Sequence, residues 1–537
     1  MKKWIMVTLS ASVLAACQST PEQTAAEQHP RNASEQPAKT AKQTPDVIIS
    51  SAGADASAPT PPVVVAEIPP QEESDIWQRI RRQLTMEIPE NARIKAQRDF
   101  YLKHPAYMER IAKRAAPFMH LIVDEIERRE LPLELALLPI VESAFDPFAY
   151  SHGSAAGIWQ FIPGTARQYG LDINWWYDGR RDVYASTHAA LDYLTDLNGR
   201  FDNWLHALAA YNSGGGRVSS AIRRNQKAGK PTDFWSLDLP RETRAYVPKL
   251  LALVDMLENY EDYQVSWLPI DNMPYLHVVE TNSQIDLALA AEKSGMALEQ
   301  LHHYNSGYNR WATDPDGPHR LLLPDENAQQ LKDWLVSAEA KDLVRWTRHK
   351  VKSGESLSVI AKRYHTTAQA IQQANSIRGH LIRAGDYLLI PAASQNASDY
   401  VLAADQRLNA TQQRQRQGKK VDHTIVSGDT LWDISRKYKV NLRELAKWNG
   451  MAPSDPLRLG QTLVVWLEGE QAKSTGVTRS IRYRVRSGDS LARIAQRFNV
   501  TIREIEQWNK IKRSSYLQPG QQLKLIVDVT RIDGSGT

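Results

Sequence analysis

The chain has 537 residues and a mass of 60.7 kDa. Because domains average about 150 residues, a chain of this length should form several. Hydrophobic residues make up 42% and charged residues 24%, which excludes a wholly disordered or collagen-like chain. The net charge of +5 is small for this length and gives no reason to expect a nucleic-acid partner. The single cysteine, Cys17, excludes an intrachain disulfide and a four-cysteine zinc site.

Residues 1–17 have the pattern of an export signal. Two lysines precede an apolar run from Trp4 to Leu14, which is too short for a spanning helix of about 20 residues. The run ends in Leu14-Ala15-Ala16-Cys17, which resembles the lipobox of bacterial lipoproteins. The resemblance implies cleavage before Cys17 and acylation of that residue, which would anchor the protein to a lipid bilayer. Gln18 in place of aspartate suggests an outer-membrane lipoprotein facing the periplasm. The alternative is an ordinary signal peptide with a chance cysteine.

Residues 18–74 are rich in Ala, Pro, Gln, Ser and Thr and contain almost no aromatic residue. Such a composition buries too little apolar surface to offset the entropy of ordering the chain. We therefore expect a disordered tether, long enough to let an anchored domain explore a nearby layer.

One pattern occurs three times in the C-terminal half, as Ser353-Gly354-Glu355-Ser356-Leu357, Ser427-Gly428-Asp429-Thr430-Leu431 and Ser487-Gly488-Asp489-Ser490-Leu491. The spacing from the glycine to a later asparagine (Asn375, Asn449 or Asn509) is the same in all three. Each repeat reads as strand, helix, helix, strand, and its Ser or Thr hydroxyl suits the cap of the first helix. The repeat resembles the LysM module, which binds glycans containing N-acetylglucosamine, such as peptidoglycan.

This resemblance implies small α+β (βααβ) modules at 343–392, 421–467 and 481–528, with sugar contacts in the loops after the first strand and before the second. Residues 269–342 show the same order without the Ser-Gly-Asp turn, which predicts a diverged LysM-like unit packed beside the preceding domain. The polar stretches 393–420 and 468–480 are expected to be linkers.

Residues 75–268 have helical periodicity and carry four motifs in order. They are Glu142-Ser143, Gly157-Ile158-Trp159-Gln160-Phe161, Ala210-Tyr211-Asn212 and Glu242-Thr243-Arg244-Ala245-Tyr246. Glu142 ends an apolar helical stretch, where desolvation would raise its pKa and let it act as a general acid. A lone Glu-Ser pair would more often lie on a solvated helix face.

Together the motifs resemble the lytic transglycosylases of the goose-type lysozyme superfamily. With the lipobox and the repeats, the match is to the membrane-bound lytic murein transglycosylase D family. The resemblance implies a multidomain protein with a mainly α, lysozyme-like catalytic domain at 75–268, and glycan strands of peptidoglycan as the partner. It assigns Glu142 as catalytic acid and a further set of residues as substrate contacts or supports of its protonation state: Ser143, Trp159, Gln160, Phe161, Tyr211, Asn212 and Tyr246. Core packing is an equal alternative for Trp159.

In such enzymes one carboxylate protonates the bond between N-acetylmuramic acid and N-acetylglucosamine. It then deprotonates the muramoyl C6 hydroxyl, which closes a 1,6-anhydro ring. A second carboxylate, as most glycosidases use, would have to come from Asp146, Asp172, Asp178 or Asp182, which read better as a helix stop and as loop or cap residues. No cofactor or metal is expected, because no histidines have ligand spacing. The rivals are a hydrolytic muramidase of the same fold and a non-catalytic wall-binding lipoprotein. The sequence predicts neither the oligomeric state nor a preference for particular stem peptides.

Overall fold

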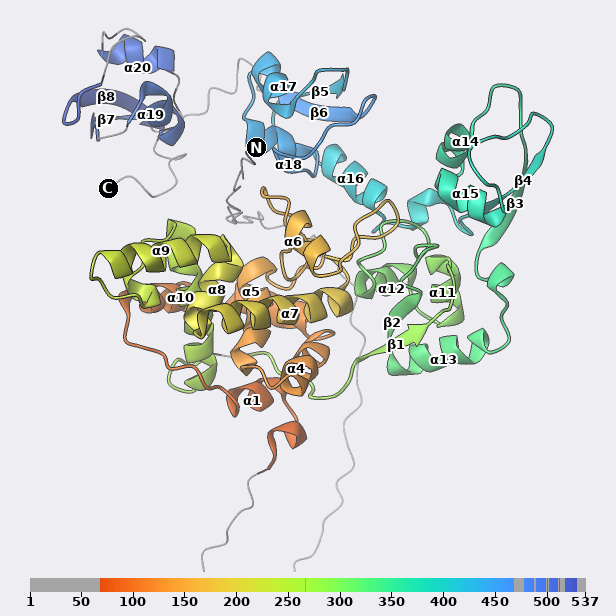
Figure 1. The fold of residues 1–537 in the computed structure, drawn as a ribbon, viewed down its shortest axis with the longest axis horizontal. Helices are drawn as coiled ribbons and strands as arrows, with labels where there is room; N and C mark the ends of the chain where they lie inside the picture. The colour runs from red at the N-terminus through yellow and green to blue at the C-terminus, as the bar shows by residue number, and fades with distance from the viewer. Residues whose placement is uncertain are drawn as a thin grey trace, which may run out of the picture. The chain divides into compact units, whose positions relative to one another are not determined.

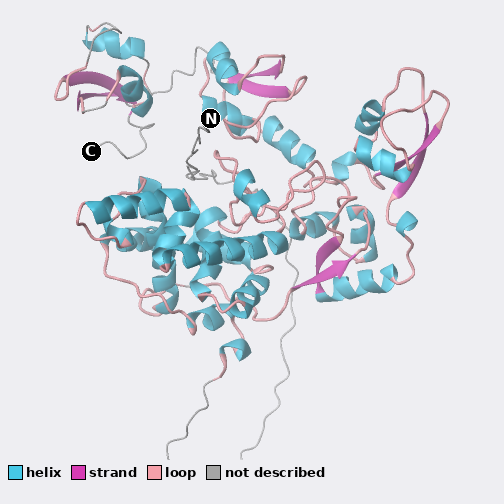
Figure 2. Cartoon of the chain, in the orientation of Figure 1, coloured by secondary structure: helices cyan, strands magenta, loops and turns pink. Residues whose placement is uncertain are grey.

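A computed structural model describes residues 68–265, 267–467, 478–486, 489–498, 500, 502–509, 511 and 517–528. The signal segment, Cys17 and nearly all of the tether lie outside these residues. Contacts group the chain into two compact units, the first made of residues up to 413 with 442–456, the second of 414–441 and 457–537. A mainly helical domain is followed by small modules with two-stranded sheets (Figure 2), which confirms the predicted fold class.

The helical domain predicted at 75–268 is built around α10 (Arg241–Glu258), whose core residues include Leu250, Leu251 and Val254, all fully buried. Helix α10 packs against α2, α5 and α8 (Figure 1). Side-chain caps begin α7 at Asp182 and α8 at Asn203. The other elements are α1 (Ile76–Arg81), α2 (Ala92–Leu102), α3 (Pro105–Ala115), α4 (Met119–Arg128), η2 (Leu133–Leu137), α5 (Leu138–Ser143), α6 (Pro163–Gln168), α7 (Val183–Phe201), α8 (Trp204–Ser213), α9 (Gly215–Lys227) and η3 (Phe234–Ser236). No helix in the described ranges is both long and apolar enough to cross a bilayer.

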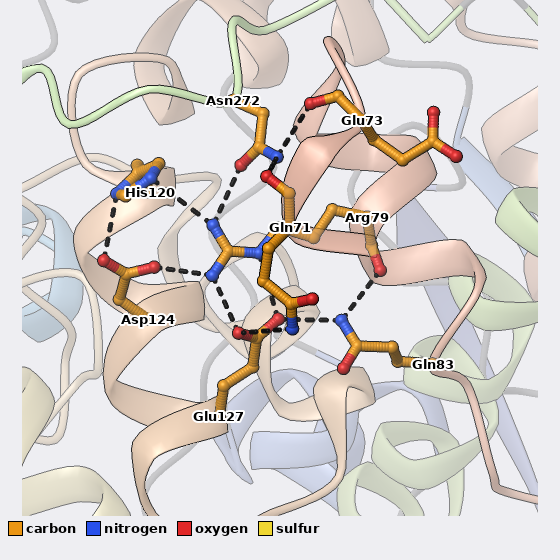
Figure 3. Close-up of polar contacts among 8 residues, drawn as sticks. All are labelled: Gln71, Glu73, Arg79, Gln83, His120, Asp124, Glu127 and Asn272. Carbon is orange, nitrogen blue, oxygen red and sulfur yellow. Dashed lines mark hydrogen bonds and ion pairs between the residues drawn. The ribbon is translucent and has the colours of Figure 1, made fainter. Parts of the chain in front are cut away.

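A buried arginine fastens the start of this domain. Arg79 of α1 is 5% exposed and binds both oxygens of Glu127 on α4, at 3.0 and 2.7 Å. It also donates to Asp124 at 2.6 Å and to Asn272 at 2.9 Å, and Figure 3 shows its side chain at the centre of these partners. Order begins earlier than the predicted end of the tether at residue 74, because η1 (Pro70–Glu72) precedes α1 and the Asn272 amide donates to the backbone of this segment.

The LysM-like unit contains β1 (Leu276–Glu280), α11 (Leu287–Lys293), α12 (Leu298–Tyr304) and β2 (Arg320–Pro324), followed by α13 (Asp325–Leu335) and η4 (Ala340–Asp342). Its two strands pair antiparallel, with Val278 opposite Leu322. The unit packs directly on the preceding helical domain. Ser306 Oγ donates to the Arg181 carbonyl at 2.6 Å, and Arg320 pairs with Asp182 at 2.7 Å.

The three repeats have the predicted order of elements and two-stranded antiparallel sheets. The first contains β3 (Arg345–Lys350), α14 (Leu357–Arg363), α15 (Ala368–Ala374) and β4 (Tyr387–Ala392). The second contains β5 (Lys419–Thr424), α17 (Leu431–Tyr438), α18 (Leu442–Trp448) and β6 (Thr462–Leu467), and the third β7 (Thr478–Arg484), α19 (Leu491–Arg497), α20 (Ile502–Asn509) and β8 (Gln522–Asp528). In the first two repeats the expected hydroxyls, Ser356 and Thr430, cap the first helix.

The regularly spaced asparagines are structural clamps. The Asn375 amide donates to Ile371 and Leu389 carbonyls and accepts from the Leu389 N–H, which ties the second helix of the module to its second strand. Asn509 makes the same three bonds in the third repeat, and Asn305 makes them in the LysM-like unit. A repeated spacing in the sequence therefore reflects a repeated backbone clamp.

Part of the expected linker 393–420 is helical. It forms η5 (Ala397–Asp399) and α16 (Ala404–Gln413), and Tyr400 is 1% exposed with its hydroxyl donating to Asp286. The N–H of Ala404 donates to the Asn309 carbonyl at 2.8 Å. The helices in this segment could not be predicted from its polar composition, because only a few apolar residues of the segment are buried.

Candidate active site

Glu142 lies in the last turn of α5, where the backbone turns sharply. Ala144 and Phe145 both adopt left-handed conformations, with φ of 52° and 56°. Their N–H groups donate back to the carbonyls of Ile140 and Pro139 and end the helix directly after the acid. A strained residue of this kind costs about 1–3 kcal/mol, and the fully buried Phe145 ring holds the turn in place.

The Glu142 carboxyl group is nearly inaccessible, with 8% of the residue exposed. The Tyr246 hydroxyl of α10 donates to its Oε1 at 2.5 Å, which is the only hydrogen bond that the carboxyl makes with the described part of the chain. Burial raises the pKa of Glu142 to about 7, while the Tyr246 hydrogen bond and the Lys249 charge lower it and the Glu242 charge raises it. A carboxyl group with this pKa can hold a proton near neutral pH and release it during a reaction.

One face of α10 supplies these neighbours. Glu242, Tyr246 and Lys249 are four and three residues apart, so they share a side of the helix. Burial lowers the pKa of Lys249, while the charges of Glu142 and Glu242 raise it. The sequence analysis gave Tyr246 a role but none to Lys249 or to Glu242, which begins the same motif. Helical spacing from Tyr246 was the signal that could have identified both.

The segment 157–161 runs close to α5 and is held by backbone contacts. Gly157 has φ of +79°, and a Cβ there would lie 1.7 Å from the Arg180 carbonyl oxygen, so only glycine fits. The Ser143 hydroxyl donates to the Ile158 carbonyl at 3.0 Å, and the Gln160 amide donates to the Gly157 carbonyl at 2.7 Å. Ser143 therefore fastens the acid-bearing helix to the segment that carries Gln160.

Two aromatic residues predicted to contact substrate are buried. Trp159 is fully inaccessible, and its indole N–H donates to the Thr187 hydroxyl at 3.0 Å. Phe161 is 3% exposed and meets the Tyr211 ring edge-on at 6.3 Å. Neither ring has a free face for a sugar. Both rings pack in the interior of the domain, as in the core-packing alternative for Trp159, because the segment turns its apolar side chains into the domain.

Helix α8 presents Tyr211 and Asn212, both partly exposed. The Tyr211 hydroxyl donates to the Trp159 carbonyl at 2.9 Å instead of to Glu142, although the Glu142 charge helps burial to raise the pKa of Tyr211. The Asn212 Oδ1 accepts from Thr243 of α10 at 2.8 Å. This bond fixes the orientation of the Asn212 amide and leaves its NH₂ group without a partner among the described residues. A group that donates a hydrogen bond to a glycan must be free in this way.

Comparison with known proteins identifies the chain. The Transglycosylase SLT domain family matches residues 122–234, and the LysM domain family matches 349–391, 423–466 and 483–525. The family described as Lytic transglycosylase MltD, LysM-like domain, matches 275–340. Membrane-bound lytic murein transglycosylase D of Escherichia coli (strain K12) is 37% identical over 456 residues, covering 85% of this chain and 86% of that protein. The chain belongs to the membrane-bound lytic murein transglycosylase D family.

Other similarities cover less of the chain. Autolysin of Enterococcus faecalis (strain ATCC 700802 / V583) is 30% identical over 182 residues, which is 33% of this chain and 23% of that protein. The crystal structure of an inactive mutant of lytic transglycosylase Slt from Pseudomonas aeruginosa is 22% identical with a TM-score of 0.24, covering 36% of this chain and 34% of that one.

Three of the four other carboxylates considered for this lytic transglycosylase D family member are held in structural roles. Asp146 accepts from the Phe148 N–H and lies 3.8 Å from Arg114, and Asp178 binds Arg180 through both oxygens at 2.8 Å. Asp182 caps α7 and pairs with Arg320, whereas Asp172 is exposed. Within the described ranges, no three His, Cys, Asp or Glu residues are grouped as a metal site would need.

Proposed function

We propose that this protein is a peptidoglycan lytic transglycosylase that cleaves the β-1,4 bond between N-acetylmuramic acid and N-acetylglucosamine, with Glu142 as its single acid and base. The observation that carries the proposal is a buried carboxyl group with a pKa near 7 and one hydrogen bond, from Tyr246. Membership of the lytic murein transglycosylase D family supports the same reaction.

In this mechanism Glu142 first gives its proton to the bridging oxygen, and the bond from that oxygen to the muramoyl C1 breaks. The 2-acetamido group of the same sugar stabilises the cationic C1. Glu142 is then a carboxylate, stabilised by the Tyr246 hydroxyl and by the positive charge of Lys249. It takes the proton of the C6 hydroxyl while that oxygen bonds to C1. A 1,6-anhydro ring forms, no water is consumed, and the acid is restored.

A single carboxylate suits this route better than hydrolysis. A retaining glycosidase places its second carboxylate about 5–5.5 Å from the first, and an inverting enzyme about 6.5–9.5 Å away. Of the four candidates, Asp146, Asp178 and Asp182 bind arginines or cap a helix, and Asp172 is exposed. With the family membership, this supports the C6 hydroxyl as the internal nucleophile and the enzyme as a lyase.

The LysM modules would hold the catalytic domain on glycan strands. Weak sites on one chain raise the effective concentration at a polymer, so joint affinity can exceed single affinity by about 10²-fold or more. Acylated Cys17 would anchor the protein to the outer membrane, facing the periplasm, because its setting resembles a lipobox. Radiolabelled palmitate should label the wild type and not Cys17→Ser.

The proposed reaction is tested with purified sacculi and the isosteric variant Glu142→Gln. Wild type should release soluble muropeptides with anhydro ends, lighter by one water molecule than hydrolysis products. Glu142→Gln should release none yet still sediment with sacculi. Glu130→Gln makes the same substitution at an exposed glutamate and should behave as wild type. Equal release by wild type and Glu142→Gln would refute the site, and reducing ends would indicate a muramidase.

A further inference from the structure

Two arginines beside the loop that follows Glu142 lack polar partners. Arg181 precedes α7, and Arg407 lies on α16 in the segment expected to be a linker. The Nε atoms of both are inaccessible to solvent and have no hydrogen-bond partner, and neither guanidinium pairs with an acid in the described part of the chain. Burying an unpaired charge is expensive, so such groups normally have a counter-ion.

The nearby carboxylates already have other partners: Asp178 binds Arg180 at 2.8 Å, Asp146 lies 3.8 Å from Arg114, and Asp405 pairs with Arg310 at 3.2 Å. Asp455 accepts from the Tyr150 and Ser154 hydroxyls at 2.8 and 2.6 Å. None of these four carboxylates forms an ion pair with Arg181 or Arg407. Within the described residues, no carboxylate lies at ion-pair distance from either guanidinium group.

The electrostatics agree with this count. Burial and, to a smaller extent, the Arg181 charge lower the pKa of Arg407 to about 9, while the Asp178 charge opposes them. Burial also lowers the pKa of Arg181, with the Arg180 charge acting in the same direction and Asp178 opposing it. Two like charges in a partly desolvated place repel each other, and a bound anion would relieve both the repulsion and the desolvation.

Aromatic rings fix both guanidiniums against the loop between α5 and Gly157. The Arg407 guanidinium lies 4.4 Å from the Phe148 ring centroid, and that of Arg181 lies 5.8 Å from Tyr150. Phe148 and Tyr150 follow Glu142 by only six and eight residues. The loop then continues into the segment that carries Gln160. The two guanidinium groups therefore contact the loop that joins Glu142 to the segment carrying Gln160.

We propose that Arg181 and Arg407 form a binding site for a carboxylate of the peptide that peptidoglycan carries on its muramoyl residue. The inference rests on the proposed function, because it concerns the sugar whose bond Glu142 is proposed to break. Guanidinium groups bind carboxylates through paired, charge-assisted hydrogen bonds. The site would make peptide-bearing glycan a better substrate, and α16 would contribute to specificity from outside the catalytic domain.

The test compares native sacculi with sacculi whose peptide carboxylates have been converted to amides by carbodiimide and ammonia. Full-length wild type should release anhydro muropeptides about tenfold faster from native than from amidated sacculi, as for loss of a hydrogen bond to a charged group. Arg181→Met and Arg407→Met should lose about the same factor on native sacculi and discriminate little between the two substrates. Arg223→Met removes an exposed arginine and should keep the wild-type ratio.

Thermal stability separates binding from a structural role. Methionine keeps the apolar stem and removes an unpaired charge, so both variants should melt at or above the wild-type temperature. Variants that melt lower and lose activity equally on both substrates would overturn the proposal, as would wild type that does not discriminate. If wild type releases no anhydro products from native sacculi, the proposed function itself fails. Equal release of anhydro products from native and amidated sacculi would contradict only the proposed carboxylate site.

Discussion

Replacing Tyr246 with phenylalanine should move the pH dependence of the reaction upward. The Tyr246 hydroxyl donates to Glu142 at 2.5 Å, and both residues are less than a tenth exposed. This bond favours the ionised carboxylate, so its loss favours the protonated form. A hydrogen bond to a charged group contributes about 1.5–3 kcal/mol, and about 1.4 kcal/mol corresponds to one pH unit. The pKa of Glu142 should therefore rise from about 7 by about one to two pH units.

The assay is the initial rate of muropeptide release from sacculi between about pH 5 and pH 10, which reports the acid in the free enzyme. The alkaline limb of the Tyr246→Phe profile should lie about one to two pH units above that of wild type, which equals the expected rise in the pKa of Glu142. Tyr211→Phe is the matched control, because that hydroxyl binds the Trp159 carbonyl and not the acid. A Tyr246→Phe limb at or below the wild-type position would refute this account of the pKa.

Three further results are expected. Arg79→Met should lower the free energy of unfolding by about 2–3 kcal/mol, because Glu127 loses its buried partner while Asp124 stays half exposed. Urea denaturation measures this change, and a difference within experimental error would contradict the prediction. Trp159→Phe should lower the free energy of unfolding by about 1–3 kcal/mol, because it removes the hydrogen bond to Thr187 and part of the side-chain volume in the core. KM should stay unchanged, and a raised KM would support a sugar-binding role for Trp159. The Lys352 N–H and His349 lower the pKa of Glu355 to about 2 in the folded protein. The ionised carboxylate therefore stabilises the fold at pH values above the unfolded pKa, and this stabilisation fades as the pH falls toward about 2. Hydrogen exchange in α14 should accordingly be faster in Glu355→Gln than in wild type near neutral pH and converge at low pH; an equal difference at every pH would exclude this role.

Some of this architecture could be predicted from the sequence because local rules determine it. The hydroxyls at positions 356 and 430 cap helices as their turn motif indicates. The apolar stretch before Glu142 predicted a desolvated acid, and the structure gives that carboxyl a raised pKa for the same reason. The asparagine spacing indicated repeats, although the clamp between helix and strand needed the fold to become visible.

Other features depend on tertiary contacts that the sequence does not encode locally. An aromatic ring such as Trp159 suits a sugar face or a core equally well, and only the fold buries it. Lys249 looks like a solvated helix charge until α10 is placed beside Glu142. Arg407 lies in a polar stretch that reads as linker, yet α16 brings it against Phe148. Ion pairs between distant segments, such as Arg79 with Glu127, have no sequence pattern at all.

The central claim is that the sugar's own C6 hydroxyl, and not water, attacks C1 after Glu142 has given up its proton. Digestion of sacculi in water enriched in heavy oxygen tests this most directly, with mass spectrometry of the muropeptides released by wild type. We predict that the new muramoyl ends carry no heavy oxygen. Incorporation of one heavy oxygen at those ends would show that water is the nucleophile and would contradict the account.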